Sequence, residues 1–237
     1  MSYRSRSYIS IGPTLTPAVK KLVIVCAVVF LFQMLGAGNE MVAIFGLVPY
    51  FVLTKLFFWQ LGTYLFLHGS VGHLFWNMFT LWMFGCELER YWGSREFVKF
   101  VLITGIGAGV LSIISQPFST IPTIGVSGAI YGILMAYGLM FPERRVYLYF
   151  LFPIKVKYFV SILGVITFFS AFSAPGSTIA HIAHLGGMVV GFLYMKNWLS
   201  FSGIRQGYHR WKLKRMRNQF KVYDSEKTRR KDDFWIN

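Results

Sequence analysis

A serine set between glycines opens one of the most apolar stretches of this chain, and it is the first candidate for chemistry. The stretch begins Gly125-Val126-Ser127-Gly128 and carries few other polar atoms. A serine hydroxyl is a weak nucleophile until a neighbouring base takes its proton, and histidine is the usual base. Gly125 and Gly128 place no side chain beside the hydroxyl, so a carbonyl group could approach it. These residue types favour acyl transfer, with hydrolysis as the expected reaction.

Two histidines near the start of a later apolar run could supply the base. His181 and His184 are three residues apart, and the residues alone leave both open. Glycines recur at every fourth position in this run and in the run after Ser127, and such faces let membrane helices pack closely. Close packing there would bring His184 or His181 beside Ser127. The recurring glycines are Gly128 and Gly132 in one run and Gly187 and Gly191 in the other.

A third apolar run carries two possible hydrogen-bond donors. His73 and Asn77 are four residues apart, so they share one face of a helix. Acyl transfer needs donors aimed at the developing oxyanion, and backbone N–H groups at a helix start would add to them. The alternatives are structural: the pair could hold a loop in place, and Ser127 could bond a carbonyl one turn back.

The histidines do not form a recognisable metal motif. His68, His73, His181 and His184 would be enough for zinc, but no H-E-x-x-H pattern is present and no acidic residue lies near them in the sequence. The two cysteines, at positions 26 and 86, have neither disulfide nor metal-ligand spacing. We therefore expect no metal and no cofactor.

Composition places these residues in a membrane protein. Of the 237 residues, 55% are hydrophobic and 14% are charged, which is too apolar for an ordinary soluble domain. The net charge of +15 could suggest nucleic-acid binding. The basic residues instead gather at the N-terminus, in alternate connectors and in the C-terminal tail, as the positive-inside rule produces. We therefore expect a lipid bilayer around the chain and no nucleic-acid partner.

The predicted fold class is all-α, a polytopic bundle of six transmembrane helices. The charge pattern requires an even number of spans and both termini in the cytoplasm, which puts Ser127 and the histidines toward the outer side. We interpret 37–69 as a structured loop with short helices at one interface; a seventh span there is the alternative. The predicted domains are 1–18, 19–196 and a basic tail, 197–237. The predicted spans are 19–36, 70–88, 97–115, 124–141, 155–173 and 179–196.

Taken together, these residues resemble the rhomboid family of intramembrane serine proteases. The resemblance covers roughly Thr54 to Tyr194, and its order and spacing are more specific than any one piece. The pieces are Trp59, His68-Gly69-Ser70-Val71-Gly72-His73 with Asn77, Glu87 to Gly93, Gly125-Val126-Ser127-Gly128 with Tyr131, and Ala183-His184-Leu185-Gly186-Gly187 with Gly191.

The resemblance implies a six-helix bundle with a Ser–His dyad and a membrane-embedded first loop. Ser127 would be the nucleophile and His184 the base, a choice that the Ala-His-x-x-Gly pattern favours over His181. His73, Asn77 and the Ser127 amide would form the oxyanion hole, and Tyr131 would pack against His184. Supporting positions would be Gly125, Gly128, His68 and Gly187, with His68 lining the water entry. Where many members have Trp-Arg in the first loop, this chain has Trp59-Gln60.

The same resemblance implies the substrate, which would be a transmembrane segment of another membrane protein. A catalytically inactive rhomboid-like binder or chaperone is the alternative, but such relatives lack the serine or the histidine. A transporter would show polar residues along a full path and repeated halves, which are not seen here. The short N-terminus lacks a transit segment and so favours a bacterial plasma membrane with the site open to the outer side. Oligomeric state does not follow from the sequence.

Overall fold

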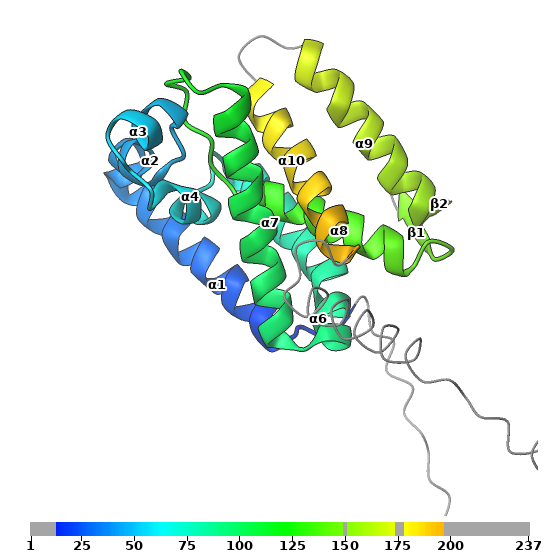
Figure 1. The fold of residues 1–237 in the computed structure, drawn as a ribbon. Coiled ribbons are helices and arrows are strands. Elements are labelled where there is room, and N and C mark those ends of the chain that lie inside the picture. The colour runs from blue at the N-terminus through cyan, green and yellow to red at the C-terminus, as the bar shows by residue number, and fades with distance from the viewer. Residues whose placement is uncertain (1–12, 149–150, 174–177, 197–237) are drawn as a thin grey trace, which may run out of the picture. The chain divides into compact units, whose positions relative to one another are not determined.

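Helices make up most of the chain in the computed structural model shown in Figure 1. The structure describes residues 13–148, 151–173 and 178–196. The first twelve residues of the predicted N-terminal segment and the whole predicted tail, 197–237, lie outside the described residues.

The first long helix bends before the first loop begins. Helix α1, Pro17–Phe32, begins at a proline, whose missing N–H would be unpaired in the first turn anyway. A π-helical turn, Gln33–Ala37, follows, and Gly36 has a φ of +109° that glycine adopts without strain. The chain then continues as α2, Gly38–Phe45.

The predicted first loop contains short helices, as expected. After α2 come three of them: α3 at Pro49–Thr54, α4 at Gln60–Thr63, and a 3-10 turn at Tyr64–Phe66. The loop is joined to the segment ahead of α8 by a backbone bridge between Leu47 and Thr123, with two N–H···O bonds of 2.9 Å.

Each of the other predicted spans contains a helix. The second span is α5, Val71–Thr80, which continues through a π-helical turn at Leu81–Gly85 into α6, Cys86–Trp92. The remaining helices are α7, Ser94–Ser115; α8, Ser127–Met140; α9, Val156–Ser173; and α10, Thr178–Met195.

Length and apolarity alone identify fewer crossings than six. Among the described residues, Pro17–Phe45 and Ser94–Ser115 are long and apolar enough to span a membrane, and three further apolar helices are shorter. Helix α8 has 14 residues. At 1.5 Å per residue it rises about 21 Å, less than the roughly 30 Å of a bilayer core. The number of crossings therefore stays a prediction.

Small residues allow α8 to lie inside the bundle. Helix α10 packs against α8, α7 and α9, and α8 also packs against α7 and α9 (Figure 1). The backbones of α8 and α10 are so close that a Cβ atom at Gly191 would lie 2.9 Å from Cα of Gly132. Ala129, Ile133 and Ala136 of α8 are fully buried. Close packing of this kind supplies dispersion contacts where no hydrophobic effect operates between helices and lipid.

A buried carboxylate fixes the start of α1. Glu89 of α6 accepts hydrogen bonds from the backbone N–H groups of Ala18 and Val19, at 2.8 and 2.9 Å, and from the hydroxyl of Thr16. Ser94, at the start of α7, donates to the same carboxylate at 2.6 Å. The first N–H groups of a helix lack intrahelical partners and carry partial positive charge, so this anion satisfies both needs.

A short β-hairpin departs from the all-α expectation. Strands β1, Arg145–Leu148, and β2, Phe152–Lys155, pair antiparallel between α8 and α9. Valine, tyrosine, phenylalanine and isoleucine in these strands favour extended structure, but the two runs of four residues are too short to stand out in the sequence.

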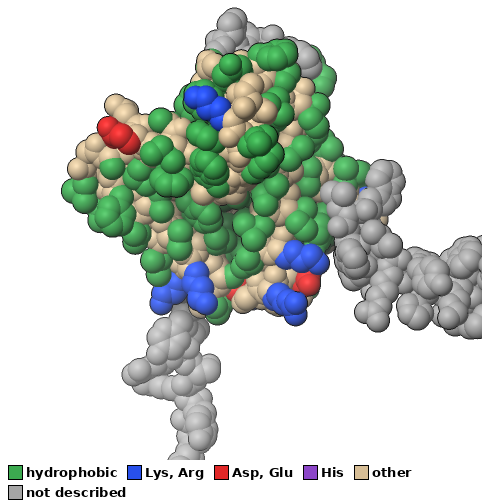
Figure 2. All heavy atoms as spheres, turned by 60° about the vertical axis from the view of Figure 1, so that its left-hand side comes forward, with side chains coloured by type: hydrophobic (Ala, Val, Ile, Leu, Met, Phe, Trp, Pro, Cys, Tyr) green, Lys and Arg blue, Asp and Glu red, His purple; other side chains and the backbone are tan. Residues whose placement is uncertain are grey.

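The surface fits a hydrocarbon solvent. Figure 2 shows one face largely covered by hydrophobic side chains, with most of its Lys and Arg side chains gathered along the lower edge. Exposed apolar side chains include Leu35 at 74%, Ile114 at 68% and Phe169 at 63%. Soluble monomers rarely expose apolar surface on this scale, so the described bundle is suited to lipid.

Candidate active site

The Ser127 hydroxyl and the His184 ring are in direct contact. Oγ of Ser127, the first residue of α8, lies 2.7 Å from Nε2 of His184 on α10. His181 lies edge-on to the ring of His184, with 6.1 Å between the ring centroids. Of the two candidate bases, His184 is therefore the one that can exchange a proton with Ser127.

Glycine makes this contact possible. A Cβ atom at Gly187 would lie only 1.8 Å from the carbonyl oxygen of Gly128, and one at Gly128 would lie 2.8 Å from Cβ of Ala108. Gly128 directly follows Ser127 on α8, and Gly187 lies three residues after His184 on α10. Any side chain at Gly187 would push α8 and α10 apart at the level of the serine and histidine.

Stacking on Tyr131 orients the imidazole. The rings of Tyr131 and His184 are nearly parallel, at 5°, with centroids 4.4 Å apart. Nδ1 of His184 is buried and has no hydrogen-bond partner among the described residues. The ring is therefore held by packing rather than by a carboxylate, unlike the histidine of a Ser-His-Asp triad.

The turn before Ser127 is pressed against His73. Gly125 has a φ of +111°, and a Cβ atom there would lie 2.8 and 2.9 Å from Cε1 and Nε2 of the His73 ring. Asn77 Nδ2 lies 3.6 Å from the same point. This nitrogen is buried and unpaired among the described residues. Buried donors usually have partners, so Asn77 has a hydrogen bond available beside the serine.

The local backbone determines which ring nitrogen of His73 carries the proton. Ser70 caps α5 by accepting the N–H of His73 at 3.1 Å, which fixes the start of the helix. The N–H of Gly69 donates to Nδ1 of His73 at 3.4 Å. With Nδ1 accepting, the neutral ring carries its proton on Nε2, the atom that faces Gly125.

Two residues that hold the backbone around the candidate site, Gln33 and Tyr64, were not predicted from the sequence motifs. Both amide atoms of Gln33 bond the backbone of His68: Oε1 accepts its N–H at 3.0 Å and Nε2 donates to its carbonyl at 3.2 Å. Tyr64 accepts the N–H of Gly125 at its carbonyl, at 2.8 Å, and its hydroxyl donates to the carbonyl of Gly105 at 2.7 Å. The one available signal was a lone glutamine in an apolar run.

His68 itself lies behind His73 rather than beside Ser127. Its side chain is buried, its ring is edge-on to His73 at 5.2 Å, and its Nδ1 lies 3.3 Å from the carbonyl of Phe66. His68 therefore packs against His73 from the loop before α5 and has a supporting role in the structure of the site.

Gln60 anchors the first loop without an arginine. Its buried side chain accepts the N–H of Val48 at 3.0 Å and donates to the carbonyl of Ile44 at 3.2 Å. The indole of Trp59 donates to the same carbonyl at 2.9 Å. One amide thus supplies both a donor and an acceptor, which a guanidinium could not do.

No group of three or more His, Cys, Asp or Glu residues in the described part of the chain could hold a metal ion. The chemistry available at this site is that of a serine, a histidine and nearby hydrogen-bond donors.

Comparison with known proteins identifies relatives. The rhomboid domain model matches residues 55–200. The chain is 30% identical over 138 residues to mitochondrial rhomboid protein 1 of Saccharomyces cerevisiae, covering 54% of this chain and 38% of that protein. It is 30% identical over 165 residues to the rhomboid protease GluP of Bacillus subtilis, covering 69% and 31%. It is 29% identical over 179 residues to the rhomboid protease GlpG of Salmonella paratyphi A, covering 74% and 60%. The match thus spans less than two thirds of each relative.

Proposed function

Because the chain belongs to the rhomboid family, we propose that it is an intramembrane serine endopeptidase that cleaves transmembrane segments of other membrane proteins. Family members are embedded in membranes, and two of the relatives are named as proteases. The observation that carries the proposal is the 2.7 Å contact between Ser127 Oγ and His184 Nε2.

The proposed reaction begins with Ser127. Its Oγ attacks the carbonyl carbon of the scissile peptide bond while Nε2 of His184 takes the hydroxyl proton, as the hydrogen bond between them allows. The carbonyl oxygen becomes an oxyanion. Collapse of this tetrahedral intermediate breaks the C–N bond, and His184 returns the proton to the leaving amine. A water molecule then attacks the acyl-enzyme, with His184 as base again, and releases Ser127.

Stabilisation of the oxyanion is assigned to three donors: Nδ2 of Asn77, Nε2 of His73 and the backbone N–H of Ser127. The available amide of Asn77 and the proton on Nε2 of His73 both support this assignment. The N–H of Ser127 adds the partial positive charge of the α8 N-terminus. Tyr131 acts as a positioning residue that holds the imidazole.

The membrane arrangement is part of the proposal. Residues 19–196 would form six crossings with both termini in the cytoplasm of a bacterium and the site open to the outer side of the plasma membrane. The basic residues at 20–21, 90–99 and 144–157 support the orientation, because they alternate with connectors that carry little charge. Two of the relatives named above come from bacteria.

Cleavage of a single-span test substrate in liposomes tests the proposal. Ser127→Ala and His184→Ala should abolish cleavage, and Ser127→Ala should also abolish labelling by a fluorophosphonate. His181→Ala is the matched control, since this neighbour is not bonded to Ser127, and it should keep most of the activity. Cleavage at the wild-type rate by Ser127→Ala would contradict the mechanism. Substrate binding without any cleavage by the wild type would favour an inactive binder.

A further inference from the structure

We propose that a cleft between α8, α9 and α10 binds an anionic glycerophospholipid, with one acyl chain in the cleft and its phosphate against the basic hairpin. The site is separate from Ser127 and His184. Its placement in the inner leaflet follows from the proposed orientation.

The cleft has the size and lining for a chain. It encloses about 560 Å³, within the range of roughly 300–1,000 Å³ typical of ligand pockets. It follows α9 from Lys157 to Phe169, which is about 18 Å at 1.5 Å per residue. Apart from Lys157 and Ser161 at one end, the lining is apolar and includes Met135, Leu185 and Met188. Figure 1 shows α9 beside α10 at the edge of the bundle, where lipid would reach the cleft.

The polar end of the cleft carries more positive than negative charge. Lys155 and Lys157 both bond the carboxylate of Glu143, at 2.7 and 2.6 Å. The hydrogen bond from Lys155, and after it the one from Lys157, lowers the pKa of Glu143 to about 2. One negative charge is therefore shared by two lysines. Arg145 is the cross-strand partner of Lys155. Like charges directly opposite one another destabilise a hairpin, and an anion between them would relieve this repulsion.

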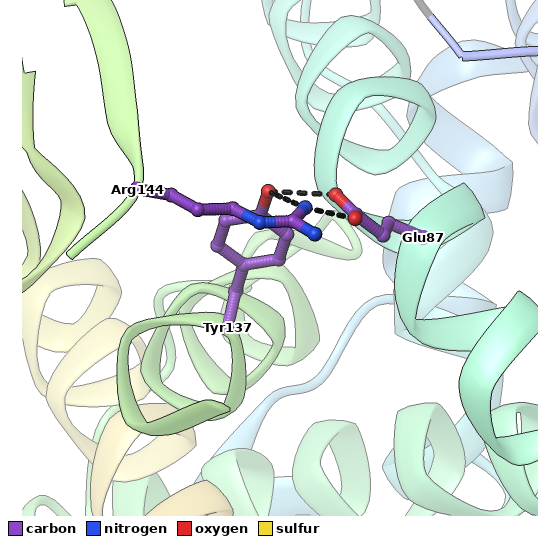
Figure 3. Close-up of polar contacts among 3 residues, drawn as sticks. All are labelled: Glu87, Tyr137 and Arg144. Atoms are coloured by element: carbon purple, nitrogen blue, oxygen red, sulfur yellow. Dashed lines mark hydrogen bonds and ion pairs between the residues drawn. The ribbon is translucent and has the colours of Figure 1, made fainter. Parts of the chain in front are cut away.

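The neighbouring arginine is already neutralised. Arg144 pairs with Glu87 of α6, and the hydroxyl of Tyr137 donates to the same carboxylate at 2.7 Å (Figure 3). Its guanidinium also lies 4.2 Å from the ring centre of Phe141. Excess positive charge therefore remains at Arg145, Lys155 and Lys157, and Lys157 lines the polar end of the apolar cleft. Basic pockets between membrane helices on the cytoplasmic side are suited to anionic headgroups.

Native mass spectrometry of the full chain in detergent tests the site. The probes are phosphatidylglycerol and phosphatidylcholine with identical acyl chains. The wild type should retain one phosphatidylglycerol in preference. Lys155→Gln with Lys157→Gln should weaken that binding roughly 25-fold, since each lysine near a membrane surface contributes about fivefold. The matched control is Lys99→Gln, because Lys99 is 41% exposed, like Lys155, and lies outside the cleft. It should leave binding unchanged.

Two further measurements distinguish a bound lipid from inorganic phosphate or a second copy of the chain. Gly164→Leu should fill the cleft and weaken both lipids, whereas inorganic phosphate should not compete, because it has no chain. Equal retention of the two lipids, or equal losses in the Lys99 and Lys155/Lys157 variants, would overturn the proposal. So would a dimer that disappears in Gly164→Leu, which would assign the cleft to a second copy. If Gly164→Leu does not fold, the lysine variants decide alone. Ser127→Ala should bind lipid normally, so this proposal and the protease proposal can fail separately.

Discussion

Replacing Gly187 with alanine should inactivate the proposed protease without unfolding it. A Cβ atom there would lie 1.8 Å from the carbonyl oxygen of Gly128, whereas real Cβ atoms keep at least 3.0 Å from such neighbours. Since the obstacle is backbone, no side chain can rotate away. Helices α8 and α10 must separate by about 1.2 Å, the difference between these two distances.

That separation acts directly on the dyad, because Gly128 follows Ser127 and Gly187 lies less than one turn beyond His184. Adding it to the 2.7 Å between Oγ and Nε2 gives about 3.9 Å, beyond hydrogen-bond contact. A misplacement of about 1 Å costs about 100-fold in rate, or about 2.7 kcal/mol of transition-state stabilisation. We expect kcat/KM to fall by that factor.

The assay is cleavage of a single-span substrate in liposomes, with Gly186→Ala as the matched control. A Cβ atom at Gly186 would meet Cβ of Leu111 on α7 at 3.2 Å, so a shift of a few tenths of an ångström accommodates it. This control should stay within a few fold of wild type. Gel filtration and thermal unfolding should show both variants folded. Wild-type kcat/KM in Gly187→Ala, or equal losses in the two folded variants, would refute the reasoning.

Three other changes test the residues around the dyad. Asn77→Ala should lower kcat by about 100- to 1,000-fold with little change in KM, as loss of one oxyanion donor does. Thr80→Ala, on the same helix, should have no such effect, and a loss confined to KM would speak against the role of Asn77. Gln33→Ala removes two hydrogen bonds worth about 1 kcal/mol each, so thermal stability and kcat should both fall. Unchanged values in both assays would show that Gln33 positions nothing. Glu89→Ala should lower the free energy of unfolding by about 1–3 kcal/mol, because two N–H groups at the start of α1 lose their acceptor. Glu96→Ala, which removes a carboxylate that is 51% exposed and 3.6 Å from Lys99, is the control for the denaturation measurement; equal losses would contradict the capping role.

The rhomboid family could be identified from the sequence, and the comparisons confirm it. Its motifs are local: Ser127 sits between glycines, and His184 is followed by Gly187 at helical spacing. Local patterns also gave the short helices of the first loop, since glycine and proline interrupt its apolar run. The assigned roles of the site residues stay predictions until activity is measured.

The residues that the sequence did not yield act through the backbone over long separations. Gln33 binds the backbone of His68, 35 residues away, and Tyr64 binds backbone atoms of Gly125 and Gly105. A backbone partner leaves no trace in side-chain type, so no pattern links the two ends of such a contact. The hairpin at 145–155 was missed because tertiary packing, not propensity, decides the structure of strands of four residues.

The shortness of α8 has a consequence for what could be cut. A 14-residue helix falls about 9 Å short of the hydrocarbon thickness. With the C-terminal end of α8 at the cytoplasmic surface, as the proposed orientation has it, a nucleophile at its first residue would lie about 9 Å below the outer edge of the hydrocarbon core. The substrate helix would have to unwind around the scissile bond, and this segment would have to reach that depth, before Ser127 could attack it. Substrates with stiff, leucine-rich helical turns at the scissile bond would unwind poorly, whereas substrates with a glycine or proline at that position would unwind more easily. The stiffness of the substrate helix, more than a consensus sequence motif, would then determine which proteins are cleaved.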